Sequence, residues 1–132
     1  MALLFQFDRE NKILLLRVAG PLTEDVVAEV QVAIRTYSNE TDAQAAIFDF
    51  SQVTEFALST PYIQRLARQK PSMKNAADRR RVIVAPEGVG FGLSRMFQTM
   101  GESTRPLLAV VRTLDEALEA LGVQSPRFER LP

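Results

Sequence analysis

The stretch that decides the fold spans residues 45–67 and reads AAIFDFSQVTEFALSTPYIQRLA. Its first six residues are mostly small, apolar or aromatic, which predicts a short buried strand over residues 45–50. Its last eight residues predict a helix that opens at Thr60 and Pro61, because proline is favoured in the first helical turn. Between them lies a predicted loop with hydroxyl and carboxylate side chains. Open α/β sheets bind ligands and partners at such strand-to-helix loops, so this stretch is the candidate functional site.

The residues before this stretch predict a hairpin followed by a helix. Two apolar runs, residues 2–7 and 12–19, are joined by a four-residue polar link, which is typical of a β-hairpin. Thr23 is then expected to cap a helix, because two acidic residues follow it in the first turn, where they complement the helix dipole. Hydrophobic residues at helical spacing continue this helix to about Tyr37.

The residues after it continue the alternation of helix and strand. A capping box, Thr-Leu-Asp-Glu at residues 113–116, is the clearest local signal and opens the last helix, which Gly122 is expected to stop. The other predicted elements are a helix from about Pro61 to an interruption at Pro71, a further turn over 72–77, a strand over 81–85, a helix over 91–100 and a strand over 106–111.

This order predicts one α/β domain over residues 1–123 and an irregular tail over residues 124–132. Strands that alternate with single helices favour parallel pairing with right-handed crossovers, and the opening hairpin adds one antiparallel strand. We therefore expect a mixed sheet of five strands with about four helices. The predicted core consists of Leu14, Leu16, Val18, Val30, Ile47, Phe48, Ile63, Leu66, Val82, Val84, Met96, Leu108, Val110 and Leu118.

The composition excludes several classes of function. The 132 residues include no Cys and no His, which rules out thiolate chemistry, serine triads and the usual zinc or non-haem iron sites. We therefore expect no catalytic residue, no metal and no cofactor. An enzymatic interpretation rests only on Asp49, Glu55 and Tyr62, and the sequence shows no pairing among them.

The charges sum to zero, so no global field attracts nucleic acid. Their distribution is nevertheless uneven. Seven acids face one arginine between residues 22 and 60, and seven bases face one aspartate between residues 61 and 81. Two solvated faces would explain this pattern; the alternative is an electropositive patch for an acidic protein, a lipid headgroup or a second copy of the chain. Few aromatic residues stand among the bases, so we expect no nucleic-acid partner.

The chain begins without a basic segment or a long apolar core, and no apolar run approaches the roughly 18 residues of a membrane span. We expect a cytoplasmic protein with neither a signal peptide nor a membrane span.

Two polar positions beside the predicted loop have both a structural and a functional interpretation. Thr60 is expected to be the N-cap of the helix at Pro61, although a helix N-terminus also favours a phosphate. A phosphorylated hydroxyl on Ser59 or Thr60 would change the local charge by nearly two units. Asp49 is expected to bond nearby loop amides, such as those after Ser51, and its alternative role is to bind a partner.

A Gly-x-Gly-x-Gly string at residues 88–92 follows one strand and opens a helix. It lacks the full dinucleotide fingerprint, so nucleotide binding is a weak interpretation and a mobile loop is the plain one. Arg95, in the first turn of that helix, is a candidate contact for an anion.

The central stretch resembles the STAS family of anti-sigma-factor antagonists. That family carries an Asp-x-Ser-x-Val segment, matched here by Asp49, Ser51 and the residues around them, then an Asp-Ser-Ser/Thr-Gly-Leu segment whose second hydroxyl a partner kinase phosphorylates. If the alignment allows one extra residue before Phe56, Leu58 aligns with the acid of the second segment and Pro61 aligns with its glycine. Ser59 and Thr60 then fall on its two hydroxyls. The resemblance spans about Lys12 to Leu121. Within the family, the sequence is closer to the divergent STAS-like proteins of bacteria.

The resemblance implies a single-wound STAS-like fold and a regulatory domain without enzymatic activity. It implies a protein partner bound through residues 51–68, and the replacements at Leu58 and Pro61 imply that the phosphorylation switch is lost. The candidate partner-binding residues are Asp49, Ser51, Ser59, Thr60, Arg65 and Arg68.

The same fold is similar to the Sec14-type lipid-binding fold, which leaves a carrier of a small apolar or lipid-like ligand, lodged between the sheet and the helices, as the alternative function. A homodimer is also expected. The second, fourth and fifth predicted strands are nearly continuous apolar runs, typical of strands covered on both faces of a sheet. The face with fewer helices would need the tail, the last helix or a second copy to cover it.

Overall fold

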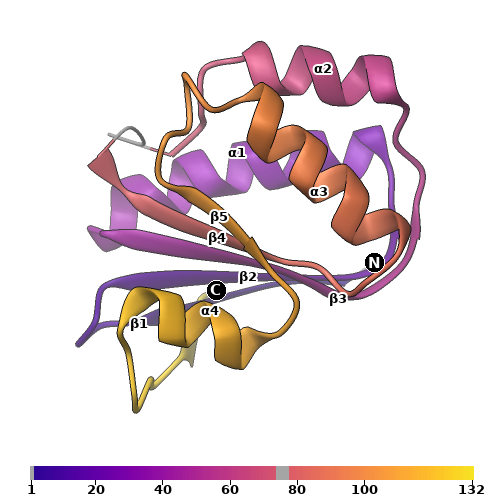
Figure 1. The fold of residues 1–132 in the computed structure, drawn as a ribbon. Coiled ribbons are helices and arrows are strands. Elements are labelled where there is room, and N and C mark those ends of the chain that lie inside the picture. The colour runs from indigo at the N-terminus through magenta and orange to yellow at the C-terminus, as the bar shows by residue number, and fades with distance from the viewer. Residues whose placement is uncertain (1, 74–77) are drawn as a thin grey trace.

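The computed structural model describes residues 2–73 and 78–132, and within them six strands form one sheet with helices on both faces (Figure 1). The elements in chain order are β1 (Ala2–Asp8), β2 (Ile13–Leu22), α1 (Glu24–Thr41), β3 (Ala45–Phe56), α2 (Thr60–Arg68), β4 (Arg80–Val84), α3 (Val89–Met100), β5 (Leu108–Val111), α4 (Leu114–Leu121) and β6 (Glu129–Arg130). The predicted alternation of strands and helices is confirmed.

The sheet has the order β5-β4-β3-β2-β1-β6. Strands β2 to β5 pair in parallel, whereas β1 is antiparallel to both β2 and β6. The mixed sheet is as predicted, but it has six strands rather than five. The sixth lies in the tail that the sequence predicts to be irregular, since Gln6 pairs with Arg130 and Phe7 with Glu129. A two-residue strand has no periodicity of its own, so it forms only where β1 offers a free edge.

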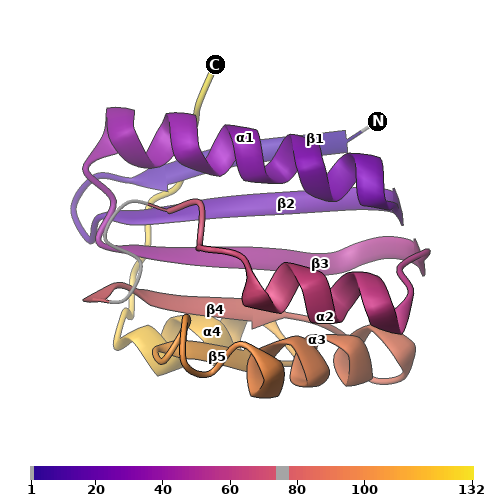
Figure 2. The same cartoon turned by 90° about the horizontal axis from the view of Figure 1, so that it is seen from above.

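The helices divide unequally between the two faces of the sheet. Helices α1, α2 and α3 cover one face, and α4 covers the other (Figures 1 and 2). Alternate residues of β4 show the division: Val82 and Val84 pack in the cluster that contains Ala117 of α4, whereas Ile83 packs with Phe97 of α3. Arg81 precedes Val82 and therefore lies on the α1–α3 face with Ile83.

The α4 face is closed by parts of the same chain. The buried residues Ile13, Leu15 and Ile47 pack there with Ala117, and Phe128 of the tail packs against them. The last helix and the tail, two of the three coverings considered above, therefore occupy this face. The homodimer stays a prediction.

Nine of the fourteen predicted core residues are buried. The other five are half-buried: Phe48, Leu66, Met96, Val110 and Leu118. Phe48 and Leu66 fall short of full burial because both line an apolar cavity between the sheet and the helices.

The largest differences from the predicted boundaries lie at the ends of β3, β2 and α1. Strand β3 continues to Phe56, through the predicted loop, because its second half pairs with residues 19–22 of β2. The pairing passes two register shifts, and β2 itself continues beyond Gly20, which has a φ of 84°. Helix α1 extends to Thr41 rather than to Tyr37. The predicted turn over residues 72–77 falls partly on residues 74–77, outside the described residues.

Candidate functional site

Helix α2 begins one residue earlier than the sequence predicts. Ser59 is its N-cap, and the Ser59 hydroxyl accepts a hydrogen bond from the backbone N–H of Tyr62 at 3.2 Å. The prediction that Thr60 caps this helix is therefore wrong, because Thr60 is already helical and Pro61 occupies the next position in the first turn. Both Ser59 and Thr60 are exposed.

Asp49 lies apart from these hydroxyls. It is buried, and its Oδ1 accepts a hydrogen bond from the backbone N–H of Ser51 at 2.9 Å, while Oδ2 lies 3.6 Å from Nε of Arg17. The expected bond from Asp49 to a nearby amide is thus confirmed, although both residues belong to β3 and not to a loop. Asp49 shares the sheet face of Ile47, under α4, whereas α2 covers the opposite face. The fold does not bring Asp49 together with Ser59 and Thr60.

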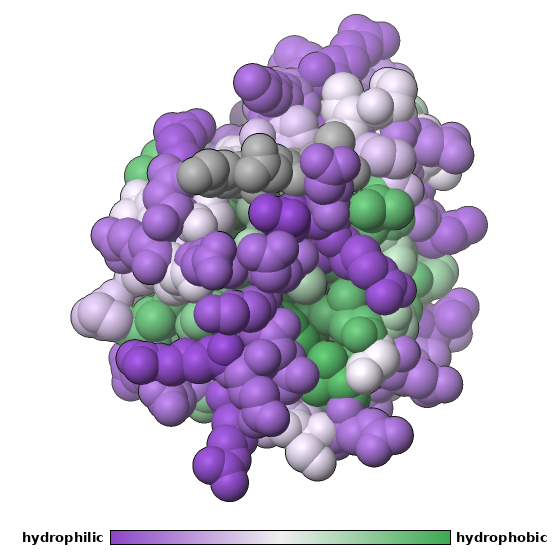
Figure 3. All heavy atoms as spheres, turned by 90° about the vertical axis from the view of Figure 1, so that its left-hand side faces the viewer, coloured by the Kyte–Doolittle hydropathy of each residue, from purple (hydrophilic) through white to green (hydrophobic). Residues whose placement is uncertain are grey.

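The predicted arginines of α2 lie on its outer surface. Arg65 and Arg68 are exposed, and the Arg65 guanidinium lies 5.9 Å from the ring centre of Tyr62. Figure 3 views the side of the molecule at which α2 ends, and the upper part of that side is mostly hydrophilic. Arg95 is also exposed, and it donates a hydrogen bond to Gln98 at 2.8 Å. All three arginine side chains are thus open to solvent.

The bases of residues 61–81 do not form one surface. Arg80 donates to the backbone oxygen of Ala120 in α4, and Arg81 is buried on the α1–α3 face. Lys74 lies outside the described residues. A strand alternates its side chains between two faces, so consecutive arginines of β4 separate.

Two glycines of the Gly-x-Gly-x-Gly string are required by backbone conformation and by packing. Gly88 adopts a φ of 100°, which residues with a Cβ rarely adopt. A Cβ on Gly90 would overlap the ring of Phe56. These two glycines are explained without a nucleotide.

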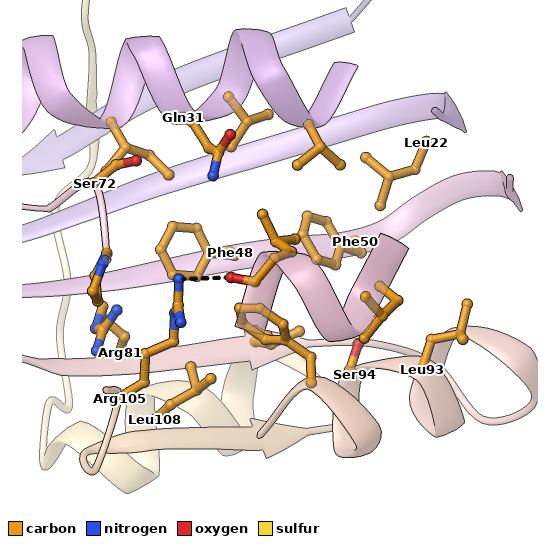
Figure 4. A pocket seen from close by; sticks show the side chains of 18 of the residues that line it. Leu22, Gln31, Phe48, Phe50, Ser72, Arg81, Leu93, Ser94, Arg105 and Leu108 are labelled. Carbon is orange, nitrogen blue, oxygen red and sulfur yellow. Dashed lines mark hydrogen bonds between the residues drawn. The ribbon is translucent and has the colours of Figure 1, made fainter. Parts of the chain in front are cut away.

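An apolar cavity of about 150 Å³ lies between the sheet and the helices α1, α2 and α3 (Figure 4). Aromatic and aliphatic side chains form most of its lining, among them Phe48, Phe50, Phe56, Leu58, Leu66 and Phe97. The sequence interpretation proposed a ligand between sheet and helices but did not identify these residues.

Two buried arginines, Arg81 and Arg105, also line the cavity. Sequence reasoning missed both as site residues. For Arg81 a signal existed: it stands two residues before Ile83 in a strand, so it must share that residue's buried face.

The described ranges contain no group of three or more His, Cys, Asp or Glu side chains placed to hold a metal ion. In the same ranges, no helix combines the length and the apolar composition that crossing a bilayer requires.

The fold is that of STAS-like anti-sigma-factor antagonists. No protein-family model matches this sequence, and no curated protein matches it. Among solved structures, the anti-sigma factor antagonist SpoIIAA in its unphosphorylated form is similar with a TM-score of 0.61 at 14% identity, over 94% of this chain and 100% of that one.

An anti-sigma factor antagonist from Mycobacterium paratuberculosis gives a TM-score of 0.60 at 18% identity, over 92% of this chain and 93% of that one. The Bacillus cell fate determinant SpoIIAA in its phosphorylated form gives 0.56 at 18% identity, over 89% of this chain and 97% of that one. The predicted STAS-like fold is confirmed over nearly the whole chain.

Proposed function

We propose that this domain is a non-enzymatic regulatory module that binds a protein partner through the exposed surface of α2. The observation that carries the proposal is the STAS-like fold, which solved anti-sigma factor antagonists share, combined with a polar outer surface on α2. Ser59 and Thr60 stand at the start of that helix, and Arg65 and Arg68 project from its later turns. Exposed arginines favour a partner with acidic groups, because they form strong, directional bonds with carboxylates.

Capture of the partner from cell extract tests this proposal. A variant with Arg65→Glu and Arg68→Glu is expected to lose a protein that the unchanged domain retains, since both side chains would then repel an acidic surface. Arg130→Glu is the matched control, because Arg130 is exposed on β6, the strand at the edge of the sheet. A partner that survives the double change, or that is lost equally with the control, would contradict binding through α2.

We also propose that the phosphorylation switch of the family is absent. The Ser59 hydroxyl already accepts the Tyr62 N–H, and Pro61 removes one of the amides that a phosphate at a helix N-terminus would use. Leu58 lies where the family has an acid, and it lines the apolar cavity. Phosphopeptide mapping of the protein from its own cells is expected to find no phosphate on Ser59 or Thr60. A stoichiometric phosphate on either residue would contradict the proposal.

A specific observation favours a second function, a carrier of a small apolar ligand. The cavity beside Phe48 and Phe97 lies between the sheet and the helices, where the sequence interpretation placed such a ligand. Cavities lined by apolar side chains bind apolar molecules with little reorganisation. Native mass spectrometry of the purified protein is expected to detect a retained small molecule if this function operates.

The homodimer and the cytoplasmic location remain proposals. Light scattering at high micromolar concentration tests the dimer: the mass of two chains is expected, and the mass of one chain would remove the proposal. Cell fractionation checks the location.

A further inference from the structure

The lining of the cavity is mostly apolar but includes two positively charged side chains. Arg81 and Arg105 are 4% and 5% exposed, and both contribute to its wall. Figure 4 shows the two arginine side chains on the same side of the cavity, with Arg105 extending toward its centre. The described lining residues include no Asp and no Glu. A largely apolar space with two cations and no carboxylate among its described lining residues attracts an anion.

Arg105 is held in position by the end of α2. Its Nη1 donates to the backbone oxygen of Ala67 at 2.9 Å and to the Thr104 hydroxyl at 3.0 Å, and Nη2 donates to the backbone oxygen of Leu66 at 3.4 Å. The dipole of a helix C-terminus is equivalent to about half a negative charge. These acceptors therefore orient the guanidinium but offset its charge only in part.

The second arginine adds to the positive potential. Burial, and then the proximity of Arg105, lowers the pKa of Arg81 to about 10, and burial lowers the pKa of Arg105. Both guanidinium groups are still charged at neutral pH. An anion between them would offset the desolvation and the mutual repulsion that these shifts report.

The rest of the lining sets the size and polarity of the ligand. The rings of Phe48, Phe50 and Phe97 form an apolar surface next to the arginines. A dry cavity of about 150 Å³ is large enough for benzene, and this cavity has a similar volume of about 150 Å³. The apolar part of a ligand is thus limited to about one aromatic ring or a short alkyl chain.

We propose that this cavity binds a small organic carboxylate, with its anionic group at Arg81 and Arg105 and its aromatic or short aliphatic body against the phenylalanine rings. The inference rests on the carrier function proposed above and specifies the chemistry of its ligand. A carboxylate suits the site because guanidinium groups bind it through paired, charge-assisted hydrogen bonds.

Calorimetric titration at neutral pH with matched pairs of ligands tests the inference. Phenylacetate and butyrate are compared with phenylacetamide and butanamide, which have nearly the same shape and no charge. Each carboxylate is expected to bind at least about tenfold more tightly than its amide. Arg105→Met and Arg81→Met are expected to reduce that preference to about twofold or less, whereas Arg105→Lys keeps part of it. Arg112→Met is the control, because Arg112 pairs with Glu87 and does not line the cavity.

The outcomes separate this inference from the function on which it rests. Equal binding of carboxylates and amides would overturn the anionic ligand and leave an apolar carrier. Binding of neither pair would overturn both. Circular dichroism establishes that each variant folds, and the comparison of carboxylate with amide on the unchanged protein needs no variant.

Discussion

The carboxylate of Asp8 accepts a hydrogen bond from the backbone N–H of Arg127, 119 residues later in the chain, at 3.1 Å. Asp8 is fully buried, and it also accepts bonds from the backbone N–H groups of Glu10 and Asn11 and from the Asn11 side chain. One side chain thus shapes the β1–β2 turn and fixes the tail that carries β6. Leu131 extends this attachment by donating to the backbone oxygen of Phe5 at 2.8 Å.

Asp8→Asn is expected to destabilise the protein by about 1–3 kcal/mol, because it weakens several bonds to a buried charged acceptor. Urea unfolding measures this loss. Hydrogen exchange at Leu131 is expected to accelerate more than exchange in β3. Asp42→Asn is the matched control: Asp42 forms an exposed ion pair with Lys12, and its loss should cost less than about 0.5 kcal/mol. Equal effects of the two changes would contradict the role of Asp8.

The stability should also depend on pH through Asp8. Burial acts to raise the Asp8 pKa, but the bonds from Asn11, Arg127 and Glu10 outweigh it, so the pKa lies below the ordinary 3.8. The folded state therefore binds this proton less readily than the unfolded state. The contribution is fully present above pH 3.8 and is lost as the pH falls through the lowered pKa. Unfolding free energies of the unchanged protein and Asp8→Asn should converge in that acidic range; a gap that stays constant down to the lowest pH would contradict this assignment.

Gly90→Ala tests the close approach of α3 to β3. Its new methyl group would overlap the Phe56 ring, so Phe56 must move, at a cost of about 1–3 kcal/mol. Gly92→Ala is the control, since no atom lies within 4 Å of its added Cβ, and alanine should stabilise a helix there by about 0.5–1 kcal/mol. Thermal unfolding is expected to shift in opposite directions for the two variants. A stabilised Gly90→Ala would show that the contact is not tight.

Ser59→Ala is expected to cost about 1 kcal/mol, because it removes the acceptor for the Tyr62 N–H. Thr60→Ala should change the stability by less than about 0.5 kcal/mol, since Thr60 is exposed and its side chain is not the helix cap. Chemical denaturation of the two variants side by side decides between them. A larger loss of stability for Thr60→Ala than for Ser59→Ala would instead support Thr60 as the helix cap, as the sequence predicts.

The sequence by itself determined the elements whose stability is local. The capping box of Thr113 and Glu116 forms as predicted, and Gly122 ends the same helix with a φ of 72°. Thr23 caps α1 by accepting the Val26 N–H. In these cases donor and acceptor lie within a few residues, so residue type and spacing are enough to fix the bond. The positions of β2 to β5 could likewise be predicted from apolar runs in the sequence, because parallel strands are buried on both faces.

Only the tertiary structure decided which polar groups meet. Asp49 and the hydroxyls of Ser59 and Thr60 are ten or so residues apart in sequence, yet opposite faces of the sheet separate them. Asp8 and Arg127 meet because β6 pairs with the edge of β1, which neither segment specifies alone. The cavity and its two arginines depend on where three helices cross one face of the sheet. Such contacts join chain segments far apart in sequence. The local pattern can place Arg81 on a buried face of its strand, but only packing brings it together with Arg105.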